Sequence, residues 1–588
     1  MSDKKGIIGD LYKSTCAVFL LSILASAIGN AIDGIVIGHF FGSKSIAAFG
    51  FTFPYQKLVL IFPGTLALGM QIICTKKLSG GKLDESNGVF SLAMGLALVI
   101  EFAFLAGVFL FPEHIAKMLG VPENSGDIRA EVIDYLQAFS LGLPAVAAVI
   151  ILTPIMQLDS DRQRTITAVV ILSVTNIAGD LINVLYLGAG MWGIGLATSV
   201  SYFVSAAFLV MHFFKPEAQF KFSTVNIKIA ELKYVLLNGM SPALGRTAAM
   251  LQATFMNHVA VGIGGHPSVA ALAIWNNLLP LVETLPRSQA QAVQAIGGML
   301  IGENDRISIL RLMKIAIKIS LQISLLIVVI LTFAAPLIVN LYISGEEAEV
   351  TTMSVEAVHW MAPTLALLAV NKLFHYFYTA YGRFTLVSTI AIVDNILFVV
   401  PLVLLMTHFF GMTGIWAAFM LNKLAVLLSI IVGGWIYNRK ISFSLEDMLL
   451  LPKDFGSPNN PQINITVYSQ AEVEKLSEQV QNFCEDNGVD AKRSLRAAIC
   501  IEEMARNIVE YGFEDGTKHS IDIRVIICGD EVTIRLRDDC RPFNPKKWHE
   551  IHNPENPVDN IGIRMVLAIA RDVNYVSILK LNYLTIKI

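Results

Sequence analysis

The sequence predicts a polytopic α-helical membrane protein that carries a separate α+β domain at its C-terminal end. The 588 residues are 54% hydrophobic and only 15% charged, with a mean hydropathy of +0.60. An average soluble domain is about 45–50% apolar and about 25% charged. The apolar part of the sequence ends near Lys440, beyond which the composition is that of an ordinary soluble domain. The apolar part also repeats itself, which predicts twelve transmembrane helices arranged as two six-helix repeats.

Twelve apolar blocks are long enough to cross a bilayer, because a hydrocarbon core of about 30 Å needs about 20 apolar residues in a helix. The blocks lie at residues 14–40, 52–75, 89–112, 134–157, 166–187, 193–214, 236–262, 268–300, 315–342, 355–378, 384–407 and 412–437. The eighth block contains Pro280, Pro286 and Gly297, so its ends are the least well defined.

The distribution of Lys and Arg predicts that both termini are cytosolic. Cytoplasmic loops carry an excess of basic residues, and the opposite connections here hold only Lys44, Lys117 and Arg129. No cleavable leader is expected from MSDKKGIIGDLYK, and six cysteines without metal-ligand spacing suit a reducing cytosol. The expected location is the cytoplasmic membrane. The net charge of −3 gives no reason to expect a nucleic-acid partner.

Two motifs recur at nearly the same spacing. GSKSIAAFGFTFP resembles GGHPSVAALAIWNNLLP, with Ala47 and Ala270 223 residues apart. GMWGIGLATSVS resembles GMTGIWAAFMLN, with Gly190 and Gly411 221 residues apart. The shared offset indicates a duplicated six-helix unit, and transporters with such repeats bind substrate near the membrane midplane between the halves. The predicted domains are a first lobe at 1–225, a second lobe at 226–440, a linker at 441–462 and a soluble domain at 463–588.

A polar stripe is expected inside the first lobe. Asp33 lies within a span near Asn30, and SVTNIAGDLINVLY places Asn176, Asp180 and Asn183 on one face of another helix. Ionisable residues in hydrocarbon are costly and are functional candidates by default. The carboxylates and amides predict a site that holds H⁺ or coordinates Na⁺ through oxygen atoms. The structural alternative is an Asp that caps a kink or bonds a neighbouring Ser or Thr.

Further ionisable residues fall within the other spans. Glu283, Lys372, His375 and Asp394 are candidates for lining a cavity of the second lobe, and Glu101 lies within the third span. The alternative for the lysine is that its ammonium reaches the membrane interface along an apolar stem.

The apolar part resembles the multidrug and toxic compound extrusion (MATE) family over residues 10–440. The resemblance is carried by NAIDGIVIGHFFGSKSIAAFGFTFP, by QLDSDRQRTITAVVILSVTNIAGDLINVLYLGAGMWGIGLATSVS and by the Gly-Met-Ser-Pro at Gly239 to Pro242. It implies two six-helix lobes that face a central cavity in a lipid bilayer.

The MATE resemblance also implies a function and a site. The family exports bulky amphipathic, often cationic compounds, driven by entry of H⁺ or Na⁺. Its first-lobe coupling site corresponds to Asp33, Asn176 and Asp180 in this sequence. The seventh span offers no carboxylate where some members have one, so an ion site in the second lobe is not expected.

The soluble domain is predicted to be an α+β sandwich with one sheet. Strand INITVYS is followed by two amphipathic helices, AEVEKLSEQVQNFCEDNG and AKRSLRAAICIEEMARNIVEYGF, and by two strands within SIDIRVIICGDEVTIRLRDD. A helix, GIRMVLAIARDV, and two closing strands, VNYVSIL and NYLTIKI, complete the unit. Alternating strands beside amphipathic helices are typical of a sheet covered on one face.

Glu503 and Asn507 lie one turn apart on the second of these helices. The spacing suits a site in which the amide oxygen binds Mg²⁺ and the carboxylate orients or deprotonates a nucleophile, because Mg²⁺ uses few protein oxygens. The same pair is common on solvated helices, so by itself it does not discriminate.

The order of motifs resembles the Bergerat-fold (GHKL) ATP-binding domain, in particular the anti-sigma-factor serine kinases. Glu-x-x-x-Asn is followed by RLRDDCRPFNP after a strand and by DNIGIRMV at the start of a helix. The resemblance implies that ATP and Mg²⁺ bind here. It assigns Glu503 as base, Asn507 as Mg²⁺ ligand, Asp538 as reader of the adenine amino group, Gly562 as part of the phosphate lid and Thr585 as a neighbour of adenine.

The glycines of this pattern are degenerate. Cys540, Asn560 and Leu581 stand where the family has Gly. Glycine favours close approach of the backbone to phosphate because it lacks Cβ. The departures favour nucleotide binding over kinase turnover.

Two functions are consistent with this organisation. In the first, the chain is a secondary antiporter whose cytosolic ATP-binding domain regulates transport, since no Gly-x-x-x-x-Gly-Lys-Ser/Thr phosphate loop is present. In the second, the membrane part is a ligand sensor and the tail is its output, either a kinase that phosphorylates a Ser on a small cytosolic antagonist protein or a switch that sequesters a sigma-like factor. A degenerate tail that only stabilises assembly is the third possibility.

Overall fold

The structure is a computed structural model that describes residues 7–79, 82–159, 161–215, 218–223, 226–343, 348–456, 460–513, 519–547, 561–578 and 581–588. It divides into two compact units. The C-terminal unit comprises Met1–Thr15, Ala295–Ile315 and Leu450–Ile588, and the membrane unit comprises Cys16–Gln294 and Ala316–Leu449. The C-terminal unit therefore includes one interior connection of the apolar part, which the predicted domain boundaries leave in the second lobe.

The apolar part is built from helices. Those of the first half are α1 Ile7–Phe41, α2 Ser43–Val59, α3 Ile61–Ser79, α4 Leu83–Leu110, α5 Pro112–Met118, α6 Gly126–Ser140, α7 Leu143–Leu158, α8 Arg162–Ile182, the π-helical turn η1 Asn183–Leu187, α9 Gly190–Val210 and η2 Met211–Phe214. Those of the second half are α10 Ala230–Val282, α11 Thr284–Gly302, α12 Arg306–Tyr342, α13 Ala348–Ala380, α14 Phe384–Ile392, the π-helical turn η3 Val393–Leu397, α15 Val399–Asn438 and α16 Leu445–Met448. Every one of the twelve predicted apolar blocks falls on these helices.

Within the described ranges, fewer separate helices of membrane length occur than the twelve predicted spans. Eight helices within the described ranges are long and apolar enough to cross a membrane, or nine if the bent pair Gly126–Ser140 and Leu143–Leu158 forms one span. Some hold more than one predicted block; Phe384–Asn438, for example, is 55 residues long. The predicted count of twelve is therefore not confirmed.

Glycines break two of the long helices between predicted blocks. Gly265 in α10 has a φ of 63°, and Gly411 in α15 has a φ of 55°. These left-handed conformations are accessible to Gly because it lacks Cβ. Each break separates two stretches of about the length that a bilayer needs.

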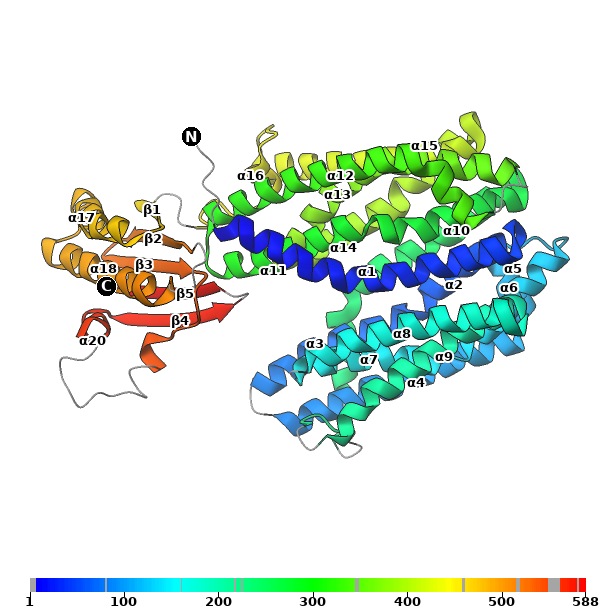
Figure 1. The fold of residues 1–588 in the computed structure, drawn as a ribbon, viewed down its shortest axis with the longest axis horizontal. Coiled ribbons are helices and arrows are strands. Elements are labelled where there is room, and N and C mark those ends of the chain that lie inside the picture. The colour runs from blue at the N-terminus through cyan, green and yellow to red at the C-terminus, as the bar shows by residue number, and fades with distance from the viewer. Residues whose placement is uncertain are drawn as a thin grey trace. The chain divides into compact units, whose positions relative to one another are not determined.

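The helices of each half of the membrane unit pack against one another, and α2 and α3 of the first half also pack against α10 of the second. In the first half, α6 and α8 pack against α9, and α4 packs against α7, whereas in the second half α13 packs against α10 and α15 (Figure 1). An aromatic cluster joins α10 to α15, because Trp275 stacks on Trp416 and on Phe419 with ring centroids 5.2 and 5.3 Å apart.

The C-terminal unit contains the predicted α+β domain. Its elements are β1 Gln462–Val467, α17 Gln470–Asp486, α18 Ala491–Gly512, β2 Ile521–Cys528, β3 Glu531–Asp538, α20 Ile561–Ile569, β4 Asp572–Ile578 and β5 Leu581–Lys587. The five strands form one antiparallel sheet in the order β1-β2-β3-β5-β4. Every predicted strand and helix of this domain is present.

The two faces of the sheet differ in character because side chains alternate along a strand. One face is apolar and packs with α17 and α18 through residues such as Ile523, Ile534 and Leu476 (Figure 1). The opposite face presents polar residues, of which Arg524 and Arg537 are buried. The sheet thus separates two chemically different sites.

Candidate functional site

Three residues predicted as an ion site come together inside the membrane unit. Asp33 lies on α1, and Asn176 and Asp180 lie one turn apart on α8. The Asn176 Nδ2 donates a hydrogen bond to Asp33 Oδ1 at 2.5 Å and lies 3.4 Å from Asp180 Oδ2. All three side chains are buried, and Asp180 is completely inaccessible to solvent. One amide therefore bridges two carboxylates that the sequence separates by 147 residues.

Two oxygen atoms of this cluster lack a partner. The Asn176 Oδ1 and the Asp180 Oδ1 are buried and accept no hydrogen bond from the described residues. Buried polar groups are normally satisfied, and an exception calls for an explanation. Oxygen atoms with unused lone pairs beside two carboxylates can hold a small cation.

The two other predicted asparagines do not join the cluster. The Asn183 Nδ2 donates to the Gly190 carbonyl oxygen at 2.9 Å, and its Oδ1 accepts from the Ala189 backbone N–H at 3.0 Å. Asn183 therefore ties η1 to the start of α9 and has a structural role. Asn30 is exposed, and no hydrogen bond links it to the cluster.

A further carboxyl group of the first half is buried without a partner. Glu101 on α4 is 0% exposed, and neither of its oxygen atoms has a hydrogen-bond partner among the described residues. An isolated carboxylate is not stable in such surroundings, so this group must be neutral or close to a bound cation.

The second half contains a cavity of about 460 Å³ that brings together all four cavity residues predicted there, Glu283, Lys372, His375 and Asp394. The Glu283 carboxylate forms ion pairs with Lys372 and with Arg287, and in each the N···O distance is 3.1 Å. The structure thus places these four residues in one cavity.

Sequence reasoning missed two lysines of the same cavity. Lys57 of α2 and Lys423 of α15 also line it. The Lys423 Nζ lies 2.6 and 2.8 Å from the two oxygen atoms of Asp394, and Asn422 donates to the same carboxylate at 2.8 Å. Both lysines lie within predicted spans, and an ionisable residue in a span is a candidate for a functional site, so the sequence did contain a signal for them.

The C-terminal unit has a larger cavity of about 710 Å³ between α18, α20 and one end of the sheet. Four of the predicted nucleotide-site residues line it, namely Glu503, Asn507, Asp538 and Gly562. The helical spacing of the first two therefore does direct both side chains to one cavity.

Asp538 is held in place by a hydrogen-bond network at the floor of this cavity. Its Oδ1 accepts from the Asn582 Nδ2 at 2.8 Å and from the Cys540 backbone N–H at 3.0 Å. The Tyr575 hydroxyl donates to the Asn582 Oδ1 at 2.7 Å and accepts from the Phe543 backbone N–H at 2.9 Å. Burial raises the pKa of Asp538 above its usual value. Asn582 and Tyr575 were not predicted as residues of this site. The sequence signal for them is that they are polar residues on the two closing strands of the domain.

Glu503, Asn507 and Gly562 form the opposite wall. The Glu503 carboxylate is ion-paired with Arg506 and lies so close to Gly562 that a Cβ there would meet Glu503 Oε2 at 1.9 Å. A side chain at position 562 would therefore require the Glu503 carboxylate to move. The Asn507 amide lines the cavity and forms no hydrogen bond with a described residue, so it is available to a ligand.

Thr585, predicted to lie beside adenine, does not line the larger cavity. It lines a different, smaller cavity of about 120 Å³ on the polar face of the sheet, together with Arg535 and Arg537. Because alternate residues of a strand point to opposite faces, Leu584 and Asn582 face the nucleotide-type cavity and Thr585 does not. Asn560, the predicted Gly replacement before α20, lies outside the described residues.

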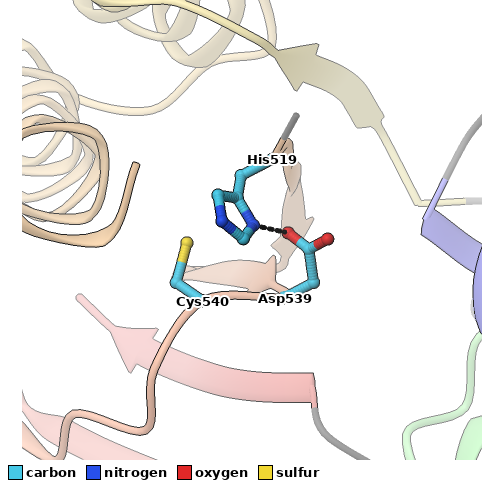
Figure 2. A group of neighbouring side chains, drawn as sticks. All are labelled: His519, Asp539 and Cys540. Atoms are coloured by element: carbon cyan, nitrogen blue, oxygen red, sulfur yellow. Dashed lines mark hydrogen bonds and ion pairs between the residues drawn. The ribbon is translucent and has the colours of Figure 1, made fainter. Parts of the chain in front are cut away.

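A group of three possible metal ligands lies at the edge of the larger cavity. His519, Asp539 and Cys540 each offer one ligand atom, all within 4.8 Å of one another (Figure 2). The His519 Nδ1 and the Asp539 Oδ1 are 3.0 Å apart and hydrogen-bonded. The mixed N, O and S donors would suit Zn²⁺, and the existing bond already ties the start of β2 to the end of β3.

The polar face of the sheet meets the connection between α11 and α12 within the C-terminal unit. The Arg524 guanidinium lies 2.8 Å from Asp305 Oδ1, and Arg537 lies 3.0 Å from Asp305 Oδ2 and 2.7 Å from Glu303 Oε2. Burial raises the pKa of Asp305, but Arg537 and Arg524 outweigh this and hold it below its usual value. Sequence reasoning did not anticipate this cluster.

Comparison with known protein families identifies both parts of the chain. The MatE family model matches residues 19–182 and 242–405. The chain belongs to the MatE family. The two matched segments begin 223 residues apart, which confirms the predicted duplication. A model of the histidine kinase-like ATPase domain matches residues 468–587, which confirms the class of the C-terminal domain. No curated protein sequence matches the chain.

Solved structures support the MATE fold. An inward-facing multidrug resistance MATE family transporter is 20% identical, covers 72% of this chain and 97% of its own, and has a TM-score of 0.65. A MOP superfamily transporter from Pyrococcus furiosus is 20% identical, with coverage of 74% and 96% and a TM-score of 0.59. A Vibrio cholerae MATE transporter is 18% identical, with coverage of 72% and 96% and a TM-score of 0.57. At these identities the likeness concerns the fold.

Proposed function

We propose that this MatE family protein is a secondary exporter of small organic compounds, coupled to entry of H⁺ or Na⁺, with a cytosolic ATP-binding domain that regulates it. It resides in the cytoplasmic membrane with both termini in the cytosol, as the distribution of basic residues favours. The observation that carries the proposal is the buried cluster of Asp33, Asn176 and Asp180.

The coupling step follows from the electrostatics of that cluster. Two carboxylates in a dry site repel each other unless a proton or a cation neutralises part of their charge. A bound H⁺ or Na⁺ stabilises the contact between α1 and α8. A proton would be held by a carboxylate oxygen such as the unpartnered Asp180 Oδ1, and Na⁺ would also be bound by the unpartnered Asn176 Oδ1. Release of the ion leaves excess negative charge, which favours opening of this contact to water.

The proposed nucleotide site uses the residues of the larger cavity. The hydrogen bonds from Asn582 and from the Cys540 backbone N–H both go to Asp538 Oδ1, and we assign Oδ2 as the atom that accepts from an adenine amino group. The Asn507 amide, which bonds to no described residue, would hold Mg²⁺, which supplies positive charge to phosphate oxygens. Glu503 acts as a general base only after it leaves Arg506, which favours binding of ATP over turnover.

Regulation follows from the two faces of the sheet. On β3, Asp538 faces the nucleotide cavity, and its neighbour Arg537 is bound to Glu303 and Asp305. On β5, Asn582 likewise faces the nucleotide cavity, and its neighbour Tyr583 faces the opposite side of the sheet, where Glu303 and Asp305 lie. A shift of these strands on ATP binding would therefore reach the connection between α11 and α12, whose helices continue into the membrane unit.

The second candidate is a signalling protein in which the tail is the output. It is favoured by the presence of Glu503 beside Asn507 in one cavity, which is the pair that a serine kinase needs. In that case a small cytosolic antagonist or sigma-like factor would be the partner. The expectation that the exported compounds are cationic stays a prediction.

Efflux from proteoliposomes that contain the full chain tests the transport proposal. Export of ethidium and of naphthalene-1-sulfonate is measured with an imposed H⁺ or Na⁺ gradient. We expect gradient-driven export of at least one compound, and at least a tenfold loss in Asp180→Asn. Asp127→Asn is the matched control, because its carboxylate is 89% exposed. Export that does not depend on the H⁺ or Na⁺ gradient would refute the coupling role and favour the signalling candidate. Equal export by Asp180→Asn and Asp127→Asn would do the same.

A further inference from the structure

The cavity of the second half has an excess of positive charge. Its charged lining residues are four cations, Lys57, Arg287, Lys372 and Lys423, and two carboxylates, Glu283 and Asp394. All of them belong to the membrane unit. With these groups in their ordinary ionised states, the lining carries two more positive than negative charges.

The two carboxylates are already engaged by lining cations. The Asp394 carboxylate binds Lys423 with both oxygen atoms, at 2.6 and 2.8 Å. The Glu283 carboxylate is shared between Lys372 and Arg287 through the same oxygen atom, Oε2, at 3.1 Å each. One carboxylate therefore serves two cations, which leaves the Glu283 group with a net positive charge.

Lys57 has no partner of its own. No hydrogen bond or ion pair to its ammonium occurs among the described residues, although the side chain is partly buried in α2 and lines the cavity. The Glu283 carboxylate acts on Lys57 electrostatically but already binds Lys372 and Arg287. A buried cation that shares its counter-charge in this way is stabilised by further negative charge from a ligand. An anionic group in the cavity would satisfy Lys57 together with the shared pair at Glu283.

Aromatic and apolar side chains form part of the cavity wall, beside neutral polar ones such as Gln252, Asn276 and Asn371. Trp275 and Phe419 line it and stack on each other with centroids 5.3 Å apart, and Trp416 supports them from behind at 5.2 Å from Trp275. Flat aromatic surfaces favour the face of an aromatic or other apolar ligand. Ligand cavities of about this kind combine an apolar wall with a few convergent polar groups.

We propose that this second-half cavity binds an amphipathic organic anion, whose carboxylate, sulfonate or phosphate group lies among Lys57, Lys372 and Arg287 and whose apolar body lies against Trp275. The proposal rests on the transport function proposed above only in naming this anion as cargo; binding itself does not depend on it. A cationic compound would meet like charge here, so the cavity favours the charge opposite to that expected from the family resemblance.

A pair of probes of similar size and opposite charge tests the proposal. Naphthalene-1-sulfonate and 1-methylquinolinium have bicyclic aromatic bodies and differ in the sign of their charge. Binding of each to the purified full chain in uncharged detergent is measured by titration calorimetry, with protein-free micelles as the blank. We expect the sulfonate to bind at least tenfold more tightly than the quinolinium.

Variants of Lys57 locate the binding site. Lys57→Gln breaks no ion pair, so it should fold normally, and we expect it to weaken sulfonate binding about tenfold. Lys57→Glu should weaken it further and improve quinolinium binding. Lys44→Gln removes the same charge from an exposed position, 61% accessible, and should leave both affinities unchanged. Thermal unfolding of each variant verifies that the fold is retained.

Three results would overturn the proposal: no sulfonate binding, tighter binding of the quinolinium, or equal effects of Lys57→Gln and Lys44→Gln. A further arm compares dioctanoyl phosphatidylglycerol with dioctanoyl phosphatidylcholine. Competition by the phosphatidylglycerol alone would identify the anion as a lipid headgroup, and lack of competition would identify it as a soluble compound. Sulfonate binding without ion-driven export would refute the proposed transport function and leave the binding site intact.

Discussion

The two halves of the membrane unit derive from one duplicated sequence, yet their polar interiors have opposite character. In the first half, Asp33, Asn176 and Asp180 form an acidic cluster without a cationic partner among the described side chains. In the second half, Arg287, Lys372 and Lys423 line a cavity in which cations exceed carboxylates, and Lys57 of α2 in the first half adds a fourth cation to it. The comparison teaches that a duplicated fold preserves helix packing while its buried charges are free to diverge, because the fold needs apolar faces and the site needs particular polar atoms.

Loss of both first-half carboxylates should have the largest effect. In Asp33→Asn with Asp180→Asn, the site can no longer exchange a charge with the bound ion, so we expect gradient-driven efflux to fall at least 100-fold in proteoliposomes. Binding of naphthalene-1-sulfonate should change less than twofold, because the second-half cavity is intact. Retention of efflux, or a parallel loss of sulfonate binding, would show that the two halves do not divide these tasks.

The second-largest effect is expected from breaking the ion pair between Arg537 of the C-terminal domain and Asp305 of the connection between α11 and α12. Arg537 and Asp305 are 7% and 6% exposed, and removal of one partner of a buried ion pair costs about 3–5 kcal/mol. Arg537→Gln should therefore lower the unfolding free energy of the C-terminal unit by about 3 kcal/mol and abolish any effect of ATP on transport. Arg571→Gln, at an 80% exposed side chain, is the control. Preserved stability and ATP response in Arg537→Gln would argue against regulation through the second repeat.

Loss of the predicted Mg²⁺ ligand should weaken nucleotide binding. Asn507→Ala should lower the affinity of the full chain for ATP about tenfold in the presence of Mg²⁺ and much less in its absence, since the amide would act through the metal. Asn482→Ala, at an exposed position of α17, should have no effect. An equal loss with and without Mg²⁺ would assign Asn507 a role in packing or direct contact instead.

The smallest effect is expected where a charge pair of the second-half cavity is broken. The side chains of Lys423 and Asp394 are 17% and 28% exposed, so water screens them in part. Lys423→Met should lower the free energy of unfolding by about 1–2 kcal/mol and weaken sulfonate binding less than Lys57→Gln does, because Lys423 is already neutralised by Asp394. If Lys423→Met weakens binding more, the assignment of the unpaired cation is wrong.

Sequence patterns predicted most of the architecture. Apolar length predicted helices that the structure contains in every block, the 221–223 residue offset predicted the duplication, and alternation predicted all five strands. The i, i+4 spacing of Asn176 with Asp180 and of Glu503 with Asn507 correctly predicted pairs on one helix face. Local periodicity is sufficient for these features because each depends on neighbours within one element.

The sequence by itself determined which elements form, that the apolar part is duplicated and which polar residues lie within it. The meeting of Asp33 with Asn176 was expected from the family resemblance, and the structure contains it. Only the tertiary structure decided that Lys57 lines the cavity that contains Glu283 and that Arg537 pairs with Asp305. It also decided that Thr585 faces away from the nucleotide cavity, since the register of β5 in the sheet sets the face of each residue. The physical reason is that partners separated by 100 residues or more are chosen by packing geometry, which no local pattern encodes.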